Sequence, residues 1–382
     1  MSIPVDYEIL RVIWWVLLGV LLIGLAVMDG FDFGVATLLP FIAKSDIEKR
    51  VVINTIGPFW EGNQIWIVLG GGAIFAAWPP IYAVSFSGFY LAMFVILAAL
   101  ILRPVGFKYR NKVNNPIWRK AFDVCLFIGG FVPALLFGVA VGNVIQGVPF
   151  HFDHDLRIHY TGTFFELLNP FGLLCGVISV CMFIKHGAVY LSLKTEGVIQ
   201  KRVKCIIPLA SVCLIITLLL ACWMSVNILP YYNITSTQNL AGPSNPLMKE
   251  VCIINGGFYH NFKNYPWMLI SPLLAFGGIL LSNLLQLLKK PFISFVFSGI
   301  SIFGIVSLPG LAMFPIILPS SSNPAQSLSV FDASSSHLTL FIMTIAVIIF
   351  VPIVLFYTGW VYHVMRGKVT EQTIQSDTNT YY

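Results

Sequence analysis

Residues 9–28 read ILRVIWWVLLGVLLIGLAVM, a run in which Arg11 is the single charged residue. Twenty residues in an α-helix rise about 30 Å, which matches the hydrocarbon thickness of a bilayer. Asp6 and Glu8 stand where a signal peptide would carry basic residues, and no small-residue cleavage site follows the run. A cleavable signal is therefore disfavoured, and the run predicts a first membrane-spanning helix.

The composition extends this prediction to the whole chain. Of 382 residues, 57% are hydrophobic and 10% are charged, against about 25% charged in a typical soluble domain. A soluble fold could not cover so much apolar surface, whereas a lipid bilayer accepts it. The net charge of +6 would suit nucleic acid, but no basic patch carries interleaved aromatic residues. We therefore expect an all-α polytopic membrane protein that binds no nucleic acid.

Nine apolar segments are long enough to be spanning helices. They cover Ile9–Met28 (continuing toward Leu39), Trp60–Trp78, Ile81–Leu102, Val124–Ile145, Thr163–Ile184, Ile206–Leu229, Trp267–Leu288, Phe292–Leu318 and Leu338–His363. Residues 1–368 are thus expected to form one transmembrane helical domain, with a polar cytoplasmic tail over residues 369–382. The longest connection, about Pro230 to Pro266, is expected to be ordered by packing alone.

The weak second segment decides between eight helices and nine. If there are nine and the N-terminus lies outside, the inner loops collect 18 of the 22 Lys and Arg residues, leaving outside only Arg11, Arg157, Lys249 and Lys263. Deleting the second helix would put the first basic cluster, at residues 44–50, on the opposite side from the others. The positive-inside rule therefore predicts nine helices, an outer N-terminus and a cytoplasmic C-terminus.

Histidines offer no evident haem ligand at membrane depth. In membrane redox proteins haem is commonly held by His or Met side chains inside the protein. All seven His are expected in loops or at helix ends, at positions 151, 154, 159, 186, 260, 337 and 363. Three of them share one outer loop and suggest a metal, but no Cys joins them, so a solvated loop is the preferred interpretation. This chain alone is expected to bind no haem and no metal.

Acidic residues inside apolar segments give the sharper functional signal, because a carboxylate in hydrocarbon is costly and often marks an ion or proton pathway. Asp29 and Asp32 are three residues apart and share a helix face. Asp29 lies about 25 Å along the helix from Val12, toward the inner side. Glu61 opens the second segment at the same side. We interpret Asp29 and Glu61 as candidate proton-relay residues and Asp32 as a weaker third.

Each of these candidates has a structural alternative. Asp32 would simply end the first span, and Glu61 would favourably occupy a helix N-terminus. Arg103, at the inner end of the third segment, is interpreted as an anchor whose side chain extends to the membrane surface.

Several short motifs together resemble subunit II of the cytochrome bd quinol oxidase family. The first two carry the acids: Asp29-Gly-Phe-Asp-Phe-Gly34 and Trp60-Glu-Gly-Asn-Gln-Ile-Trp66. The others are Phe75-Ala-Ala-Trp-Pro79, Arg103-Pro-Val-Gly106, Tyr160-Thr-Gly162, Asn169-Pro-Phe-Gly172, Met313-Phe-Pro315 and Pro319-Ser-Ser321. They follow the family's order along essentially the whole chain, so they are specific as a set although each is weak alone.

The resemblance implies a terminal oxidase of the bacterial cytoplasmic membrane that oxidises quinol and reduces dioxygen to water. It implies a heterodimer in which subunit I ligates haem b and haem d, while subunit II forms two four-helix bundles plus a peripheral helix. It also allows a small single-helix subunit. Phe59 stands where some relatives have His and Glu61 where some have Asp, which puts an imidazole step in doubt but keeps the carboxylate.

A function of another class uses the same acids. A secondary transporter or proton channel could employ Asp29, Asp32 and Glu61, and interrupted helices in two matching halves would favour it. No such pair of halves is evident in the sequence. A scaffold for the haem subunit, in which the acids are inert, overlaps with the oxidase interpretation.

Overall fold

A computed structural model describes residues 3–236 and 239–376. Within these residues, eight helices are long and apolar enough to cross a membrane. The first is the continuous pair α1 (Tyr7–Met28) and α2 (Gly30–Ile42); the others are α7 (Tyr90–Tyr109), α8 (Pro116–Gln146), α9 (Pro170–Lys194), α10 (Gly197–Asn227), α12 (Ile270–Leu287, preceded by the 3₁₀ turn Pro266–Leu269), α13 (Pro291–Met313) and α14 (His337–Val364). The expected all-α polytopic fold is confirmed.

The second predicted segment is present but interrupted. It consists of a single turn, α4 (Trp60–Asn63), and α5 (Ile65–Ala77), with Gln64 between them. The 13 residues of α5 rise only about 20 Å, so this helix alone is shorter than the hydrocarbon core of a bilayer, which is about 30 Å thick. Helix α5 packs against α1 and α14, and α6 (Pro79–Gly88) follows it before α7.

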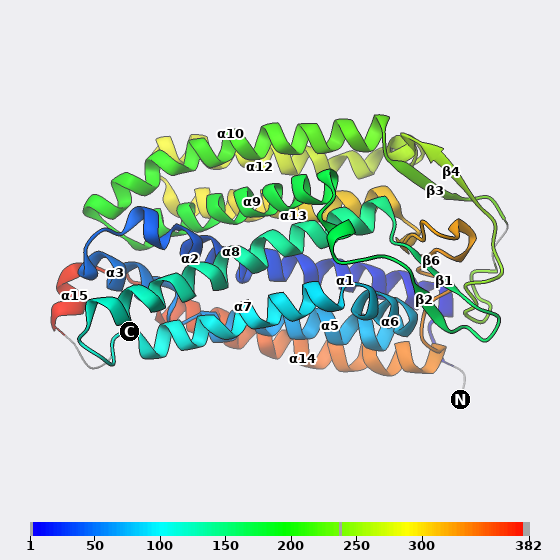
Figure 1. Cartoon of the computed structure of the whole chain (residues 1–382), viewed down its shortest axis with the longest axis horizontal. Helices are drawn as coiled ribbons and strands as arrows, with labels where there is room; N and C mark the ends of the chain where they lie inside the picture. The colour runs from blue at the N-terminus through cyan, green and yellow to red at the C-terminus, as the bar shows by residue number, and fades with distance from the viewer. Residues whose placement is uncertain (1–2, 237–238, 377–382) are drawn as a thin grey trace.

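The long helices lie side by side along the longest axis of the molecule (Figure 1). Helices α10 and α12 lie along one side, and α5, α7 and α14 lie along the other. In chain order, α1–α2, α5, α7 and α8 form one four-helix bundle, α9, α10, α12 and α13 form the second, and α14 is peripheral. Only 6% of the most apolar stretch of α14 is buried within the chain.

The two bundles meet closely where α2 crosses α9. A Cβ atom at Gly34 would lie 1.9 Å from the carbonyl oxygen of Phe183, and one at Gly187 would lie 2.7 Å from the backbone of Gly34. Any side chain at either position would therefore separate the helices. This contact brings α9 against the helix that carries Asp29 and Asp32.

The end that holds the N-terminus carries three short hairpins (Figure 1). They pair β1 (Phe150–Phe152) with β2 (Ile158–Tyr160), β3 (Pro230–Ile234) with β4 (Val251–Asn255), and β5 (Ile316–Leu318) with β6 (Leu328–Ser329). The same end holds α11 (His260–Asn264) and the 3₁₀ turns Phe165–Leu168, Gly257–Tyr259 and Pro324–Gln326.

The expectation that the connection from about Pro230 to Pro266 is ordered by packing alone is wrong. Besides the β3–β4 hairpin, buried Arg11 donates hydrogen bonds to the carbonyl oxygens of Leu240 (2.6 Å) and Gly242 (3.0 Å). It also donates to the Ser334 hydroxyl at 2.7 Å. A charged side chain of the first helix thus fixes a loop more than 220 residues away in sequence.

The opposite end carries α3 (Asp46–Ile56) and the tail helix α15 (Glu371–Ser376). Ser45 and Glu48 form a reciprocal capping box that starts α3. In the tail, the Val369 N–H donates to the Lys194 carbonyl, and Ile374 is buried against α3. The tail is polar in sequence, yet its described part packs onto the helical domain; its last six residues lie outside the described ones.

Candidate functional site: a buried acid pair on one arginine

Asp29 lies where α1 passes into α2, and Asp32 lies in the first turn of α2. Both side chains are completely buried. The start of α2 provides backbone N–H dipoles that favour a carboxylate. The prediction that these two acids share one face is confirmed by their common contact with a single cation.

That cation is Arg103 of α7, whose side chain is also fully buried. Its Nη2 and Nη1 atoms donate to the two carboxylate oxygens of Asp29 at 2.8 and 3.2 Å. The same Nη2 lies 3.8 Å from Asp32 Oδ2, and the guanidinium carbon lies 4.6 Å from the centre of the Phe33 ring. The two-point contact makes Asp29 the dedicated partner of the arginine.

The interpretation of Arg103 as a surface anchor is wrong. A glycine on the neighbouring helix, Gly129 of α8, leaves room for the side chain: a Cβ atom there would lie 2.6 Å from Arg103 Cγ. The arginine therefore turns inward toward the acids rather than along the helix to the membrane surface.

Asp32 has weaker partners than Asp29. Its Oδ2 accepts a hydrogen bond from Asn63 Nδ2 at 2.8 Å, and its buried Oδ1 has no hydrogen-bond partner among the described residues. Asn63 is fixed in turn by Tyr362 of α14, whose hydroxyl donates to Asn63 Oδ1 at 2.9 Å. Two carboxyl groups thus share one guanidinium, and Asp32 is the one with an unsatisfied oxygen.

Glu61 lies apart from this cluster. Its side chain is 59% exposed on the surface of this chain and forms an ion pair with Lys108 at 3.0 Å, where Lys108 is 55% exposed. The structure therefore brings together two of the three predicted acids, Asp29 and Asp32. Glu61 lies on the same single turn, α4, as Asn63, and this turn is its connection to the cluster.

Sequence reasoning missed Arg103, Asn63 and Tyr362 as members of the site. Arg103 gave a usable signal, because two acids at membrane depth need a buried cation. Asn63 lies in the same motif as Glu61, two residues further on, but Tyr362 gave no signal because it comes from α14, the last spanning helix. Only the folded chain brings these residues together.

The placement of residues 185 and 186 in an inner loop was also wrong. Lys185 and His186 lie inside α9, which continues to Lys194, and both are buried. His186 does not fit a haem ligand, because both ring nitrogens are already engaged, Nδ1 by the Ser298 hydroxyl at 3.0 Å and Nε2 by the Val27 carbonyl at 3.1 Å.

The outer-loop histidines lie on the β1–β2 hairpin. His151 and His159 are cross-strand partners with stacked rings 5.2 Å apart, and His159 Nε2 lies 3.6 Å from Asp153 Oδ2. Backbone N–H groups of Arg157 and Asp155 lower the pKa of Asp153. Across the described residues, no three His, Cys, Asp or Glu side chains are grouped closely enough to hold a metal ion.

The fold and this site define a polytopic helical membrane protein with two acids and one arginine clustered and buried between its helices. Comparison with known sequences is more specific. The chain belongs to the family described as cytochrome bd terminal oxidase subunit II, whose model matches residues 10–365. It is accordingly a subunit of a respiratory oxidoreductase complex, and the family implies haem and a partner subunit I in that complex.

Individual relatives cover the whole chain. It is 48% identical to the probable cytochrome oxidase subunit 2 of Haemophilus influenzae and 47% identical to the cytochrome bd-I ubiquinol oxidase subunit 2 of Escherichia coli K12. Each match covers 99% of this chain and 100% of the relative. The bd oxidase structure from Geobacillus thermodenitrificans matches with a TM-score of 0.65 at 15% identity, covering 94% of this chain and 98% of that one, which supports the fold. The resemblance is confirmed, and the transporter alternative is set aside.

Proposed function

We propose that this chain is the haem-free subunit of a quinol-oxidising bd complex, and that it supports assembly of the haem-bearing subunit I and supplies part of a proton-uptake route. Full-length similarity to a ubiquinol oxidase subunit supports quinol as the electron donor. A small single-helix subunit is a further expected partner. The described helices that face outward with apolar side chains, α14 above all, suit contact with lipid or with such partners.

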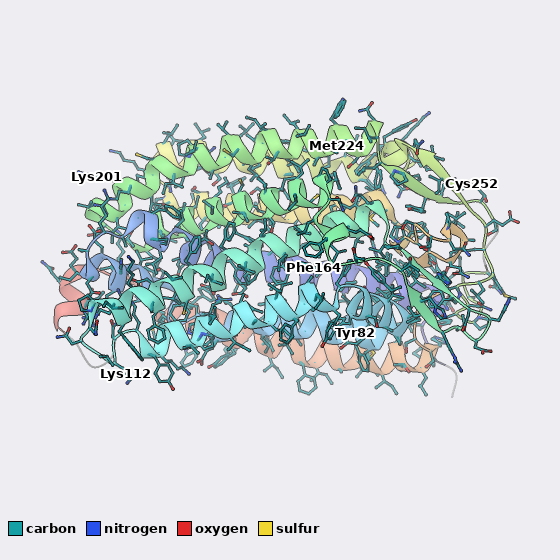
Figure 2. The ribbon with its side chains drawn as sticks, in the orientation of Figure 1. Tyr82, Lys112, Phe164, Lys201, Met224 and Cys252 are labelled. Carbon is teal, nitrogen blue, oxygen red and sulfur yellow. The ribbon has the colours of Figure 1, made fainter. Side chains whose placement is uncertain are left out.

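The proposed orientation places the N-terminus outside and the C-terminus in the cytoplasm of a bacterium. In Figure 2, Lys112 and Lys201 lie at one end of the molecule and Cys252 lies at the other. The C-terminal tail helix shares the end with the two lysines, and the N-terminus shares the end with Cys252. This segregation supports the inner position of the basic loops.

The observation that carries the proton-uptake proposal is the imbalance of charge at Arg103. Ionising both buried acids would leave one net negative charge without a partner, which is costly at membrane depth. Asp29 is held by two hydrogen bonds from the guanidinium, whereas Asp32 has only an amide donor and one free oxygen. Asp32 is therefore the carboxyl group that binds and releases a proton, and Asp29 keeps Arg103 in place.

The path to Asp32 begins at the surface of α4. Glu61 is exposed and paired with Lys108, so it can exchange protons with water. Asn63 donates a hydrogen bond to Asp32. Tyr362 is connected to Asp32 only through its own hydrogen bond to Asn63. An amide passes protons poorly, so Asn63 orients the Asp32 carboxyl group, and internal water carries the proton between Glu61 and Asp32.

The test is turnover of the assembled oxidase with matched acid-to-amide substitutions. Asp32→Asn should slow quinol oxidation about a hundredfold, the lower end of the usual range for proton-transfer catalysis, with haem content unchanged. Asp29→Asn should also slow turnover, because Asp32 then becomes the permanent partner of Arg103. Glu61→Gln should cost about twofold, since water can replace an exposed group.

The control is Asp332→Asn, which removes a carboxylate from the outer end of the chain and should leave turnover per haem unchanged. Normal turnover in a fully assembled Asp29→Asn, Asp32→Asn double variant would leave both acids with a structural role and overturn the proposal.

A further inference from the structure

Four exposed lysines form a cluster beside helices that carry no acidic residue. Lys201 and Lys204 lie in the first turns of α10, and Lys289 and Lys290 connect α12 to α13. No Asp or Glu occurs in residues 197–248 or 251–331. Within the part of the chain that the structure describes, no carboxylate lies within 4.0 Å of any of these four ammonium groups. The lysine cluster therefore carries positive charge that the chain itself does not neutralise.

Neighbouring cations at the same end of the molecule do have carboxylate partners. Arg202 lies between the two lysines of α10 in sequence, yet it pairs with Glu48 at 2.8 Å. Lys368 of the tail pairs with Glu196 at 2.7 Å, just before α10 begins. Lys204 has only the side-chain oxygen of Gln200, at 3.3 Å. The surplus of positive charge is thus local to the α10 and α12 side of this end.

The register of α10 and α12 places the lysines at one level. The Ser211 hydroxyl of α10 donates to Asn283 Oδ1 of α12 at 3.0 Å, and the two helices run in opposite directions. Lys204 lies seven residues before Ser211, almost two full turns, so it shares that face of α10 and lies about 10 Å nearer the end of the molecule. Helix α12 ends about one turn after Asn283. Lys204 therefore lies level with the turn that holds Lys289 and Lys290.

The backbone of that turn does not favour a lysine. Lys289 has a φ of 56°, in the left-handed region, just after the end of α12, where glycine is the usual residue. The Lys290 N–H donates to the Leu285 carbonyl at 2.9 Å and closes the turn. A cation near a helix C-terminus is favourable, but Lys290 alone would supply it. The Lys289 side chain therefore has its use outside the turn.

Apolar surface continues from the lysine cluster toward the middle of both helices. Exposed side chains on this surface are Leu209, Val212 and Ile216 of α10 and Leu280, Leu284 and Leu287 of α12. These helices lie along the side of the molecule opposite to α5, α7 and α14 (Figure 1). The ligand that fits has an anionic group at the membrane surface and apolar chains that extend into the bilayer.

We propose that the lysine cluster binds the phosphate of an anionic phospholipid, whose acyl chains lie along the exposed faces of α10 and α12. Ammonium groups donate charge-assisted hydrogen bonds to phosphate oxygens. Basic groups beside spanning helices at one membrane surface are a usual site for acidic lipid headgroups, and each lysine raises the affinity about fivefold. A zwitterionic lipid lacks the net charge that the cluster needs. This site does not depend on the proton-uptake proposal.

The test is photolabelling of the complete oxidase with phosphatidylglycerol that carries a photoreactive group on an acyl chain. Label on residues 197–227 and 270–287 is measured by mass spectrometry as the lipid concentration is raised. Lys289→Gly removes one charge and gives the turn a residue that suits its backbone, so the half-saturating concentration should rise about fivefold while the fold is kept. Lys204→Gln should raise it by the same factor, and the two changes together by about 25-fold.

The control Lys112→Gln removes a lysine at the same end but on the other side of the molecule (Figure 2), and it should leave the half-saturating concentration unchanged. Unlabelled phosphatidylglycerol should reduce the labelling, whereas phosphatidylcholine or inorganic phosphate at the same concentration should not. Equal competition by phosphatidylcholine would overturn the proposal, as would displacement by inorganic phosphate. So would an unchanged half-saturating concentration in the double variant, or an equal rise in Lys112→Gln.

Discussion

Two buried ionic sites in this chain differ in how their charges balance. At the α1–α2 junction, Arg103 faces both Asp29 and Asp32. At the end of the molecule that carries the hairpins, which we propose lies outside the membrane, Lys249 forms a 2.7 Å ion pair with Asp332 alone. Lys249 also donates to the Pro246 carbonyl, and Asp332 accepts from the Ser329 N–H.

This difference is why we propose a structural role for the outer pair and a functional role for the inner site. The outer pair is balanced: it has one cation and one anion, and each of them has a further hydrogen bond to the backbone. The inner site has one carboxyl group too many. Asp32 Oδ1 has neither a hydrogen bond nor an ion pair among the described residues, whereas Asp332 Oδ2, which also lacks a hydrogen bond, lies 2.7 Å from the Lys249 ammonium group. A charge imbalance of this kind is expensive to keep in a membrane, which is why we assign it a role in proton uptake.

The largest effect should follow from removing the shared cation. Arg103→Met leaves Asp29 and Asp32 buried without a partner, which costs about 3–5 kcal/mol, so most of the assembled, haem-containing complex should be lost. Arg103→Met combined with Asp29→Asn should recover assembly, because the remaining acid, Asp32, can stay protonated. The yield of haem-containing complex measures both variants. Failure of the double variant to recover would mean that Asp32 is ionised in the folded chain.

Changes to the outer pair should lower the stability of the chain and leave turnover per haem unchanged. Lys249→Met leaves Asp332 without its cation and should destabilise the chain by about 3 kcal/mol. Burial lowers the pKa of Lys249, and Asp332 only partly opposes this, so the pair itself contributes little net stability. Lys249→Met with Asp332→Asn should therefore unfold close to the wild-type temperature.

In all of these outer variants, turnover per haem should equal that of the wild type. A pronounced loss of turnover in the assembled Lys249→Met complex would erase the distinction between the two sites.

The smallest effect concerns the balanced pair of Glu48 and Arg202, at the end of the molecule that we propose lies inside. Burial disfavours the charge of Glu48, but the N–H groups of Lys44 and Ser45 and the Arg202 guanidinium lower its pKa overall. A lowered pKa stabilises the fold above the unfolded value of about 4.3, and this stabilisation is lost as pH falls through the folded pKa.

Glu48→Gln should thus lower stability by no more than about 1 kcal/mol at neutral pH, because the pair is partly screened by water. The difference from wild type, measured by thermal unfolding, should vanish in acid. Glu196→Gln, at the exposed pair with Lys368, serves as the control. A difference that persists unchanged in acid would show that the Glu48 charge is not its cause.

Hydropathy predicted the helices well, because a spanning segment must be apolar over its whole length. It missed the interruption at Gln64 and the hairpin β3–β4, which depend on contacts between distant residues. It also ended the fifth segment at Ile184, because Lys185 and His186 look like the start of a polar loop. Only the packing of α9 against α2 and α13 explains why these two residues lie inside.

The site was predictable in part for the same reason. Asp29 and Asp32 stand out because acids are rare in apolar segments, and their spacing places them on one face. Their partner Arg103 was misassigned because an arginine near a helix end usually reaches the membrane surface. Its inward direction depends on Gly129 of a neighbouring helix, and no pattern in the sequence of α7 records that contact.

The most direct test of the central claim is an infrared measurement of the complete oxidase near neutral pH. We predict a carbonyl band from a buried, protonated carboxylic acid that is absent in Asp32→Asn and retained in Asp332→Asn. A spectrum of Asp32→Asn that keeps the full band would mean that Asp32 holds no proton, and would contradict the account.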